Sequence, residues 1–336
     1  MNKKLLSLFV ITLITINFSF AFQTSKAKKF AKTITEKELS EHLYIYASDE
    51  FEGRDTGAPG QKKAVEYIRN YYKSIGVEPG DLEGDYFQEM TLTMRGRRGQ
   101  KPKTVETENV IAIIKGSEKP DEYVVITAHL DHVGVTDGEI YNGADDDGSG
   151  TVALLEIAEA FQKAVKDGKR PKRSVLFLHV TGEEKGLLGS SFYVQNPIFP
   201  IANTVANLNI DMVGRIDPKR KGDRNYVYLI GADKLSTELH DLSEAMNTKY
   251  TNIELDYTYN DEKDPNRFYY RSDHYNFAKY NVPIIFYFNG THDDYHQHTD
   301  TPDKINYDLL QNRARLVFHT AWEISNRDKR LVVDKP

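Results

Sequence analysis

Short apolar runs alternate with longer stretches that carry apolar residues on one helical face along most of this chain. Residues 174–180 form a nearly continuous apolar run, which is typical of a strand that is covered on both faces. Residues 151–165 have the three- and four-residue apolar spacing of an amphipathic helix, at Leu154, Ile157, Ala158, Phe161 and Val165. Strands that alternate with helices predict a mainly parallel sheet between two layers of helices.

The same patterns predict the other regular elements. We expect further strands at residues 109–114, 123–127, 204–210, 226–230, 253–257 and 282–288. We expect further helices at residues 35–47, 61–75, 234–249 and 307–324, the first of them opened by a capping box at residues 35–38. Neither an internal repeat nor a long linker divides the chain. The predicted fold is therefore a single α/β domain with a mixed, mostly parallel sheet that is flanked by helices on both faces.

Five short segments each supply an oxygen or nitrogen side chain suited to a metal ion. They lie at residues 128–131 (AHLD), 142–148 (NGADDDG), 182–184 (GEE), 209–212 (NIDM) and 295–301 (YHQHTDT). Most of them come directly after an apolar run that predicts a buried strand. Sites in open α/β sheets gather at the carboxyl ends of strands, so we expect these segments to meet in space.

The pair His129 and Asp131 follows the predicted strand at residues 123–127. Two side chains in a His-x-Asp sequence cannot easily bind one ion when the backbone is extended. Asp131 can instead accept the second ring N–H of His129, which fixes the tautomer and strengthens the imidazole as a ligand. We therefore expect His129 to bind metal and Asp131 to support it.

Three adjacent carboxylates, Asp145, Asp146 and Asp147, precede the predicted helix at residues 151–165. Such groups repel one another, and helix capping with dipole complementarity would account for one or two of them. A carboxylate that bridges two cations would relieve the repulsion directly. We assign that bridging role to Asp146.

Two neighbouring acids, Glu183 and Glu184, come directly after the apolar run at residues 174–180. Adjacent side chains point in different directions, so one can bind a metal while the other reaches a water as a general base. Asp211 ends another apolar run, and His296 lies after the last predicted strand. Two His, two Asp and one Glu would give each of two ions three protein ligands if one Asp bridges. That leaves room for a shared water, as a catalytic site requires.

The combined motifs resemble those of the secreted bacterial di-zinc aminopeptidases. The matching segments are GADDDGSG, GEE, NIDM and YHxxxDT, and also SDEFEGR at residues 48–54 and SDH at residues 272–274. The wider family includes glutamate carboxypeptidase and the glutaminyl cyclases. The resemblance extends from about Leu39 to the closing helix, and it implies a zinc-peptidase fold and two Zn²⁺ ions, with Mn²⁺ or Co²⁺ as substitutes.

The resemblance also implies a role for each matching residue. It places Asp146, Glu184 and His296 on one zinc ion. It places His129, Asp146 and Asp211 on the other.

The remaining assignments concern the chemistry beside the ions. The resemblance makes Glu183 the general base and Asp131 the partner of His129, and Tyr295 matches a tyrosine that donates a hydrogen bond to the oxyanion in some relatives. His298 is a rival for the last ligand. The four-residue step to Asp300 favours His296.

The activity implied is hydrolysis of the N-terminal bond of a peptide with a free amine, with a zinc-bridging water as nucleophile. A carboxypeptidase or a glutaminyl cyclase on the same scaffold is an alternative, although the cyclases use a single zinc. A non-catalytic binding ectodomain is a second alternative, but such relatives lose ligands that this chain keeps. An inserted protease-associated domain, present in many relatives, is expected to be absent.

The first 21 residues predict a secretory signal peptide. Lys3 and Lys4 precede an apolar stretch at residues 5–16, and residues 19–21 offer a small-residue cleavage site. Retention as a membrane anchor is the alternative, but the stretch is shorter than the ~20 residues that span a bilayer. We expect an exported protein, periplasmic or extracellular, without a stable membrane anchor after cleavage, whose mature domain covers residues 22–336.

Composition narrows the chemistry further. The formal net charge is −6, and loss of two lysines with the leader would make it −8. This balance argues against a nucleic-acid partner, which would need a basic face. The chain has no cysteine, so it has no disulfide or thiolate ligand, and any metal must be held by His, Asp and Glu. Residues 257–271 are rich in aromatic side chains and are expected to form a loop near the site.

Overall fold

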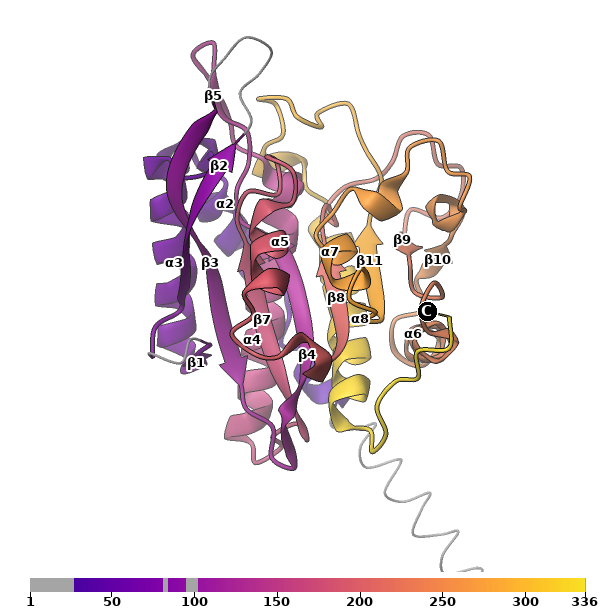
Figure 1. The fold of residues 1–336 in the computed structure, drawn as a ribbon. Coiled ribbons are helices and arrows are strands. Elements are labelled where there is room, and N and C mark those ends of the chain that lie inside the picture. The colour runs from indigo at the N-terminus through magenta and orange to yellow at the C-terminus, as the bar shows by residue number, and fades with distance from the viewer. Residues whose placement is uncertain (1–26, 81–83, 95–101, 336) are drawn as a thin grey trace, which may run out of the picture.

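The computed structural model describes residues 27–80, 84–94 and 102–335. Nine of the strands form one twisted sheet in the order β1-β3-β7-β4-β8-β11-β9-β10, and β2 also pairs with β3 (Figure 1). A separate hairpin joins β5 (Gly134–Thr136) to β6 (Glu139–Tyr141). The strands of the main sheet are β1 (Glu78–Pro79), β2 (Phe87–Met94), β3 (Lys103–Ile114), β4 (Lys119–His129), β7 (Arg173–Val180), β8 (Thr204–Ile210), β9 (Tyr226–Ile230), β10 (Glu254–Asp256) and β11 (Ile284–Phe288).

The four central strands, β7, β4, β8 and β11, run parallel to one another. On either side of them the direction reverses, because β3 is antiparallel to β7 and β9 is antiparallel to β11. Every residue of β7, β8, β9 and β11 is buried, which explains why apolar residues dominate these strands. The carboxyl ends of the central strands consequently lie side by side at one edge of the sheet.

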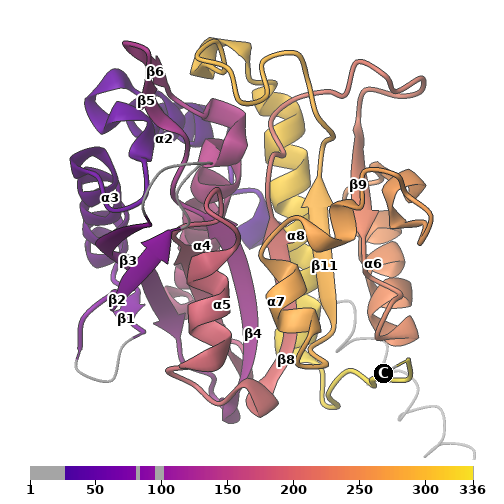
Figure 2. The same cartoon turned by 45° about the horizontal axis from the view of Figure 1, so that its top comes forward.

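Helices cover both faces of this sheet (Figure 1, Figure 2). The larger of two main apolar cores joins one face to α2, α3, α4, α6 and α8, and the smaller joins the opposite face to α5 and α7. The helices are α2 (Glu36–Tyr46), α3 (Pro59–Ile75), α4 (Gly150–Lys166), α5 (Leu188–Gln195), α6 (Thr237–Tyr250), α7 (His274–Ala278) and α8 (Tyr307–Asn326). The single α/β domain with a mixed sheet between helices is thus confirmed.

Local signals account for the helix boundaries. The Thr35 hydroxyl accepts the backbone N–H of Glu38, as the capping box predicts, and α2 begins at Glu36. Pro59 starts α3, and Gly76 ends it in the left-handed conformation that glycine adopts without strain. Asp147 accepts the N–H of Gly150 at the first turn of α4. These caps satisfy backbone groups that the helices leave unpaired.

The predicted strands at residues 109–114 and 123–127 follow one another in the chain but are not neighbours in the sheet. These segments belong to β3 and β4, which do not pair, because β7 lies between them. Strand β2 was not among the predicted elements, although its alternation of buried and exposed residues is the usual signature of a strand. Among the described residues between α3 and β3, only β1 and β2 occur, and no inserted domain is found there.

One prediction falls outside the described part of the chain. The leader at residues 1–21 is not described. Within residues 27–80, 84–94 and 102–335, no helix combines the length and the apolarity needed to cross a membrane.

Candidate metal centre

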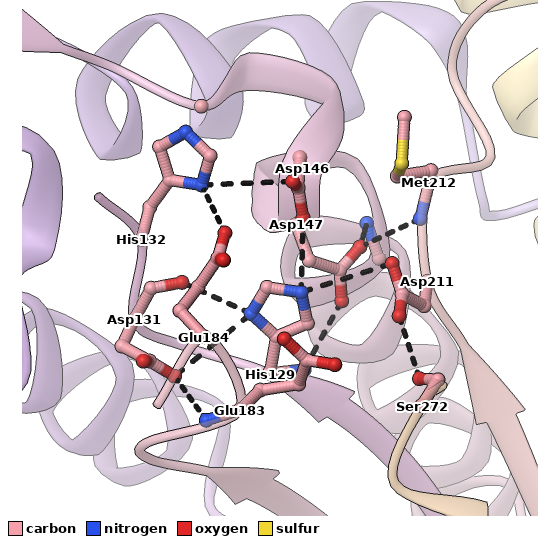
Figure 3. Close-up of polar contacts among 12 residues, drawn as sticks. His129, Asp131, His132, Asp146, Asp147, Glu183, Glu184, Asp211, Met212 and Ser272 are labelled. Atoms are coloured by element: carbon pink, nitrogen blue, oxygen red, sulfur yellow. Dashed lines mark hydrogen bonds and ion pairs between the residues drawn. The ribbon is translucent and has the colours of Figure 1, made fainter. Parts of the chain in front are cut away.

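The predicted metal ligands come together at the carboxyl ends of the parallel strands. His129 is the last residue of β4, Asp211 directly follows β8, and Glu184 follows β7 by four residues. His296 lies in the loop after β11, and Asp146 lies in the turn before α4. Figure 3 shows side chains from four of these segments converging on one point.

The first group of donor atoms surrounds His129. Its Nε2 lies 3.1 Å from Asp146 Oδ1 and 3.7 Å from Asp211 Oδ1. All three residues are buried, and their donor atoms lie within 4.8 Å of one another. One ion between these atoms would have two carboxylates and one imidazole, which suits zinc, manganese or cobalt.

The second group of donor atoms surrounds Glu184. His296 Nε2 lies 3.0 Å from Asp146 Oδ2 and 3.2 Å from Glu184 Oε1. The two oxygens of Asp146 therefore face different partners, Oδ1 toward His129 and Oδ2 toward His296. This is the arrangement that a carboxylate bridging two cations requires.

A further imidazole, that of His132, belongs to this second group and was not among the predicted ligands. Its Nδ1 lies 2.9 Å from Glu184 Oε1 and 3.8 Å from Asp146 Oδ2 (Figure 3). His132 comes only three residues after His129. Its proximity in sequence was an available signal, but the alternating direction of an extended backbone gave no reason to expect both rings at one centre.

The hydrogen bonding of these residues also indicates a metal ion, whatever the residue types. Buried polar atoms nearly always have a hydrogen-bond partner. Asp146 Oδ2, Glu184 Oε1 and His132 Nδ1 are buried and have no such partner among the described residues. A shared cation would satisfy all three atoms at once.

The pKa shifts of two residues at this centre also support bound cations. Burial alone would lower the pKa of His129, but the surrounding carboxylates, Glu183 first, raise that pKa well above its ordinary value. Burial, followed by the charges of Asp211 and Glu184, raises the pKa of Glu183 well above its usual range. The shift of His129, and the part of the Glu183 shift that comes from neighbouring carboxylates, report an excess of negative charge that cations would neutralise.

Asp131 supports the centre in a different way from the one expected. The His129 Nδ1 atom contacts the backbone carbonyl of Asp131 at 3.0 Å, whereas the nearest carboxylate oxygen is 3.9 Å away. The carboxylate instead accepts the backbone N–H of Glu183 at 3.1 Å and the Thr56 hydroxyl at 2.8 Å. The expected side-chain contact is therefore corrected to a main-chain one, and the side chain positions Glu183.

The neighbours of Asp146 have structural roles. Asp147 accepts backbone N–H groups from His129 at 3.0 Å and Met212 at 3.1 Å, so it ties two ligand-bearing strand ends together. Asp145 accepts the N–H of Gly214 at 2.7 Å. These contacts explain three adjacent acids without three metal ligands.

The other motifs hold the ligand loops in place. Ser272 donates to Asp211 Oδ2 at 2.6 Å, which accounts for the SDH motif. Asp300 accepts the backbone N–H of Asp146 at 3.2 Å, so it links the His296 loop to the central acid. The buried Arg54 guanidinium donates to the carbonyls of Leu130, Asn142 and Gly143 and joins the loops that carry His129 and Asp146.

A pocket opens directly beside the centre. Its polar wall includes Asp146, Glu183 and Asp211, and Tyr295 lines it next to His296, on which its ring stacks at 4.0 Å between centroids. The rest of the lining consists of Met212, Phe268, Arg271, Phe286, Phe288 and Thr291.

The aromatic loop at residues 257–271 contributes to this pocket in part. Phe268 and Arg271 line it, so the loop lies near the site as expected. Tyr259 instead packs on Phe268 and Tyr228, and Tyr270 packs on Tyr275 away from the pocket lining. His298, the rival for the last ligand, is exposed and lies in neither group of donor atoms.

The sequence model of peptidase family M28 matches residues 109–321, well over half of the chain. The chain belongs to peptidase family M28. The matched range contains all five predicted ligands, His132 and Glu183. Family M28 is a family of zinc peptidases, and the donor set found here is of the type that such an enzyme needs.

Curated M28 relatives include plant and fungal proteins. A probable glutamate carboxypeptidase of Arabidopsis thaliana is 35% identical over 136 residues, which is 40% of this chain and 18% of that protein. A probable zinc metalloprotease of Leptosphaeria maculans is 33% identical over 139 residues, 40% of this chain and 31% of that protein. This chain therefore matches less than a third of the length of these relatives.

Solved structures extend the likeness to most of the chain. An aminopeptidase from Aneurinibacillus sp. strain AM-1 has a TM-score of 0.67 at 19% identity, covering 92% of this chain and 98% of that one. The glutaminyl cyclase of Porphyromonas gingivalis has a TM-score of 0.65 at 19% identity, covering 85% and 97%. At these identities the likeness shows the M28 fold and leaves the reaction to be argued from the site.

Proposed function

We propose that this M28 protein is an aminopeptidase that removes the N-terminal residue of peptides with two zinc ions and Glu183 as general base. The observation that carries the proposal is that Glu183 and three ligand candidates, Asp146, Asp211 and His296, line one pocket with an apolar wall. A hydrolase needs a place for the scissile bond beside both the metal and the base.

The ligand roles follow from the two groups of donor atoms. His129 and Asp211 would hold one zinc, and Glu184 and His296 the other, with Asp146 between them. Bound zinc would polarise the scissile carbonyl and acidify the attacking water. Mn²⁺ or Co²⁺ would suit the same donors.

The remaining chemistry falls to protein groups at the pocket. The backbone N–H of Glu183 donates to the Asp131 carboxylate, which holds Glu183 in place. The raised pKa of Glu183 brings it closer to the range in which a carboxylate accepts and returns a proton. It would take the proton of the water and deliver it to the leaving amine. Tyr295, which lines the same pocket, would donate its hydroxyl proton in a hydrogen bond to the developing oxyanion.

The pocket also supports a preference at the cleaved residue. Met212, Phe268, Phe286 and Phe288 form its apolar wall, and ligand sites are lined mainly by such side chains. A single apolar or aromatic side chain would bury its surface there. We therefore propose that peptides with an apolar N-terminal residue are the best substrates.

A carboxypeptidase is the second candidate, and one residue favours it. Arg271 lines the pocket, and its planar guanidinium is suited to a free carboxylate. A glutaminyl cyclase has less support, because a single-zinc enzyme would not need both groups of donor atoms. A non-catalytic ectodomain has less still, because none of the predicted ligands is missing.

Peptides blocked at one end distinguish these activities. We expect an unblocked tripeptide with N-terminal Phe and its C-terminal amide to be cleaved at similar rates, whereas N-acetylation should abolish release of Phe. A carboxypeptidase would instead cleave the N-acetylated peptide and fail on the C-terminal amide. Arg271→Ala should then abolish carboxypeptidase activity but leave an aminopeptidase active, and Arg267→Ala is the matched control because Arg267 lies over Tyr270 outside the pocket lining.

Export is the last part of the proposal. The basic start and apolar stretch of residues 1–16, followed by a small-residue site at 19–21, support a signal peptide that releases a periplasmic or extracellular enzyme. N-terminal sequencing of the mature protein should begin at Phe22. A chain that retains residues 1–21 in the membrane fraction would contradict this.

A further inference from the structure

We propose that His132 is a fourth protein ligand of the metal position formed by Asp146, Glu184 and His296. The inference concerns the centre used in the proposed function and deepens it. It makes the two metal positions unequal, with four protein donors at one and three at the other.

The His132 ring is fixed in the fold. Its side chain is fully buried, and its backbone N–H donates to the Arg54 carbonyl at 3.2 Å. A Cβ atom placed on Gly143 would lie 2.5 Å from Cγ and Cδ2 of the ring, so the ring packs directly against this glycine. Only a residue without a side chain leaves room for the ring at this point of the GADDDGSG segment.

The position of Nδ1 fits a ligand better than a hydrogen-bond donor. Glu184 Oε1 is only 2.9 Å away, yet neither atom has a hydrogen-bond partner among the described residues. A short contact without a hydrogen bond is what two lone pairs that both face one cation would show. Two ligands of one ion have this relation, because each directs its lone pair at the ion between them.

The distances agree with one shared ion. Ligand atoms at ~2.0–2.1 Å from a tetrahedral zinc are ~3.3 Å from one another. His132 Nδ1 lies 2.9 Å from Glu184 Oε1 and 3.8 Å from Asp146 Oδ2, which brackets this spacing (Figure 3). The donor atoms of these three residues lie within 4.8 Å of one another.

Hydrogen bonds in the described part of the chain do not account for this ring. Neither Nδ1 nor Nε2 of His132 has a hydrogen-bond partner there. A buried imidazole without a hydrogen bond is costly, and coordination would remove the cost at Nδ1.

The two positions would then differ in function. His132, His296, Glu184 and Asp146 would supply four protein donors to this ion and would hold it firmly. His129, Asp211 and Asp146 leave an open position on the other ion, which is what a catalytic zinc keeps for substrate. We expect the ion beside His132 to bind more tightly and to be removed last by a chelator.

Zinc titration of the metal-free protein against a chromophoric chelator tests the inference. The wild type should show two affinities, and His132→Gln should weaken the tighter one by more than the ~10–100-fold typical of losing a residue that only supports a ligand. His298→Gln is the matched control, since His298 is an exposed histidine in neither group of donor atoms. It should change nothing.

The choice of glutamine separates coordination from hydrogen bonding. A glutamine amide can still donate to Glu184, so a residue that merely positions Glu184 would tolerate His132→Gln. Unchanged affinity in this variant would overturn the proposal. Circular dichroism of the metal-free variant should match the wild type.

A second test uses the unmodified protein and therefore does not depend on whether the His132→Gln variant folds. X-ray absorption with one equivalent of zinc should show two imidazoles around the metal, His132 and His296. One imidazole would overturn the inference. The two-zinc function is tested separately by uptake of a second equivalent, so failure of either conclusion can be told from failure of the other.

Discussion

The carboxylate of Asp131 accepts a hydrogen bond from the backbone N–H of Glu183, with 3.1 Å between Oδ1 and N. The carbonyl of the same Asp131 contacts His129 Nδ1 at 3.0 Å. One residue therefore orients a metal ligand with its main chain and the general base with its side chain. Substitutions of this side chain should separate the two effects.

We expect Asp131→Ala to keep both metals but to lower kcat by about 10–100-fold, because the residue at 131 still offers its carbonyl to His129 while Glu183 loses its support. Asp131→Asn keeps an acceptor oxygen and should be affected less. Metal content and kcat of both variants check this. Metal loss in Asp131→Ala as severe as in His129→Ala would show that the carboxylate, not the carbonyl, holds the ring.

The adjacent acids Glu183 and Glu184 should respond differently to the same change. Glu183→Gln should retain metal and fold but lose at least the ~10²–10⁴-fold in rate that general-base removal costs, because an amide cannot accept the proton of water. Glu184→Gln should weaken metal binding, and excess zinc should partly restore its rate. Elemental analysis and turnover of the two variants decide the matter. High activity in Glu183→Gln would refute its assigned role.

Zinc binding should release protons. Burial would lower the pKa of His296, but Asp146 and Glu184 raise it to about 10 in the metal-free protein, and the pKa of His129 is also well above its ordinary value. Both rings therefore carry a proton at pH 7.5 that metal must displace. We expect about two protons to be released per chain as two zinc ions bind.

Calorimetry in buffers of different ionisation enthalpy measures this release. Because the two pKa values are raised, apparent affinity should fall steadily as pH decreases below about 10, and not only below pH ~6, as unperturbed histidines would predict. Proton release near zero at pH 7.5 would contradict the electrostatic picture, and uptake of only one zinc would favour the glutaminyl cyclase.

Acid stability should depend on a histidine far from the metal centre. Burial lowers the pKa of His319 to about 3, so the folded protein keeps this ring neutral while the unfolded chain protonates near pH 6.5. Stability is then fully present above pH 6.5 and is lost as pH falls toward 3, at about 1.4 kcal/mol per pH unit.

Urea unfolding of metal-free His319→Phe tests this dependence. A phenylalanine can keep the stacking on Tyr250, whose ring centroid is 3.8 Å away, and it cannot titrate. Between pH 6.5 and 5 we expect the variant to lose about 2 kcal/mol less than the wild type. His298→Phe should follow the wild type, and an equal acid sensitivity in all three proteins would disprove the assignment.

The sequence by itself determined the elements and most of the site. Apolar spacing specified the central strands because each is buried on both faces, and β8 and β9 begin and end where the pattern predicts. The ligand-bearing segments were visible because each follows a strand. Parallel strands bring their carboxyl ends to one edge, so His129, Glu184 and Asp211 had to meet there.

Tertiary structure alone decided the finer contacts. Insertion of β7 between β3 and β4 depends on sheet order, which local periodicity does not encode. The approach of His132 to Glu184 joins residues 52 positions apart in the chain and requires that Gly143 leave space for the ring. Whether the carbonyl or the carboxylate of Asp131 contacts His129 depends on local backbone direction. Such contacts are fixed only when the packed elements set the distances between distant residues, and residue type and spacing do not contain that information.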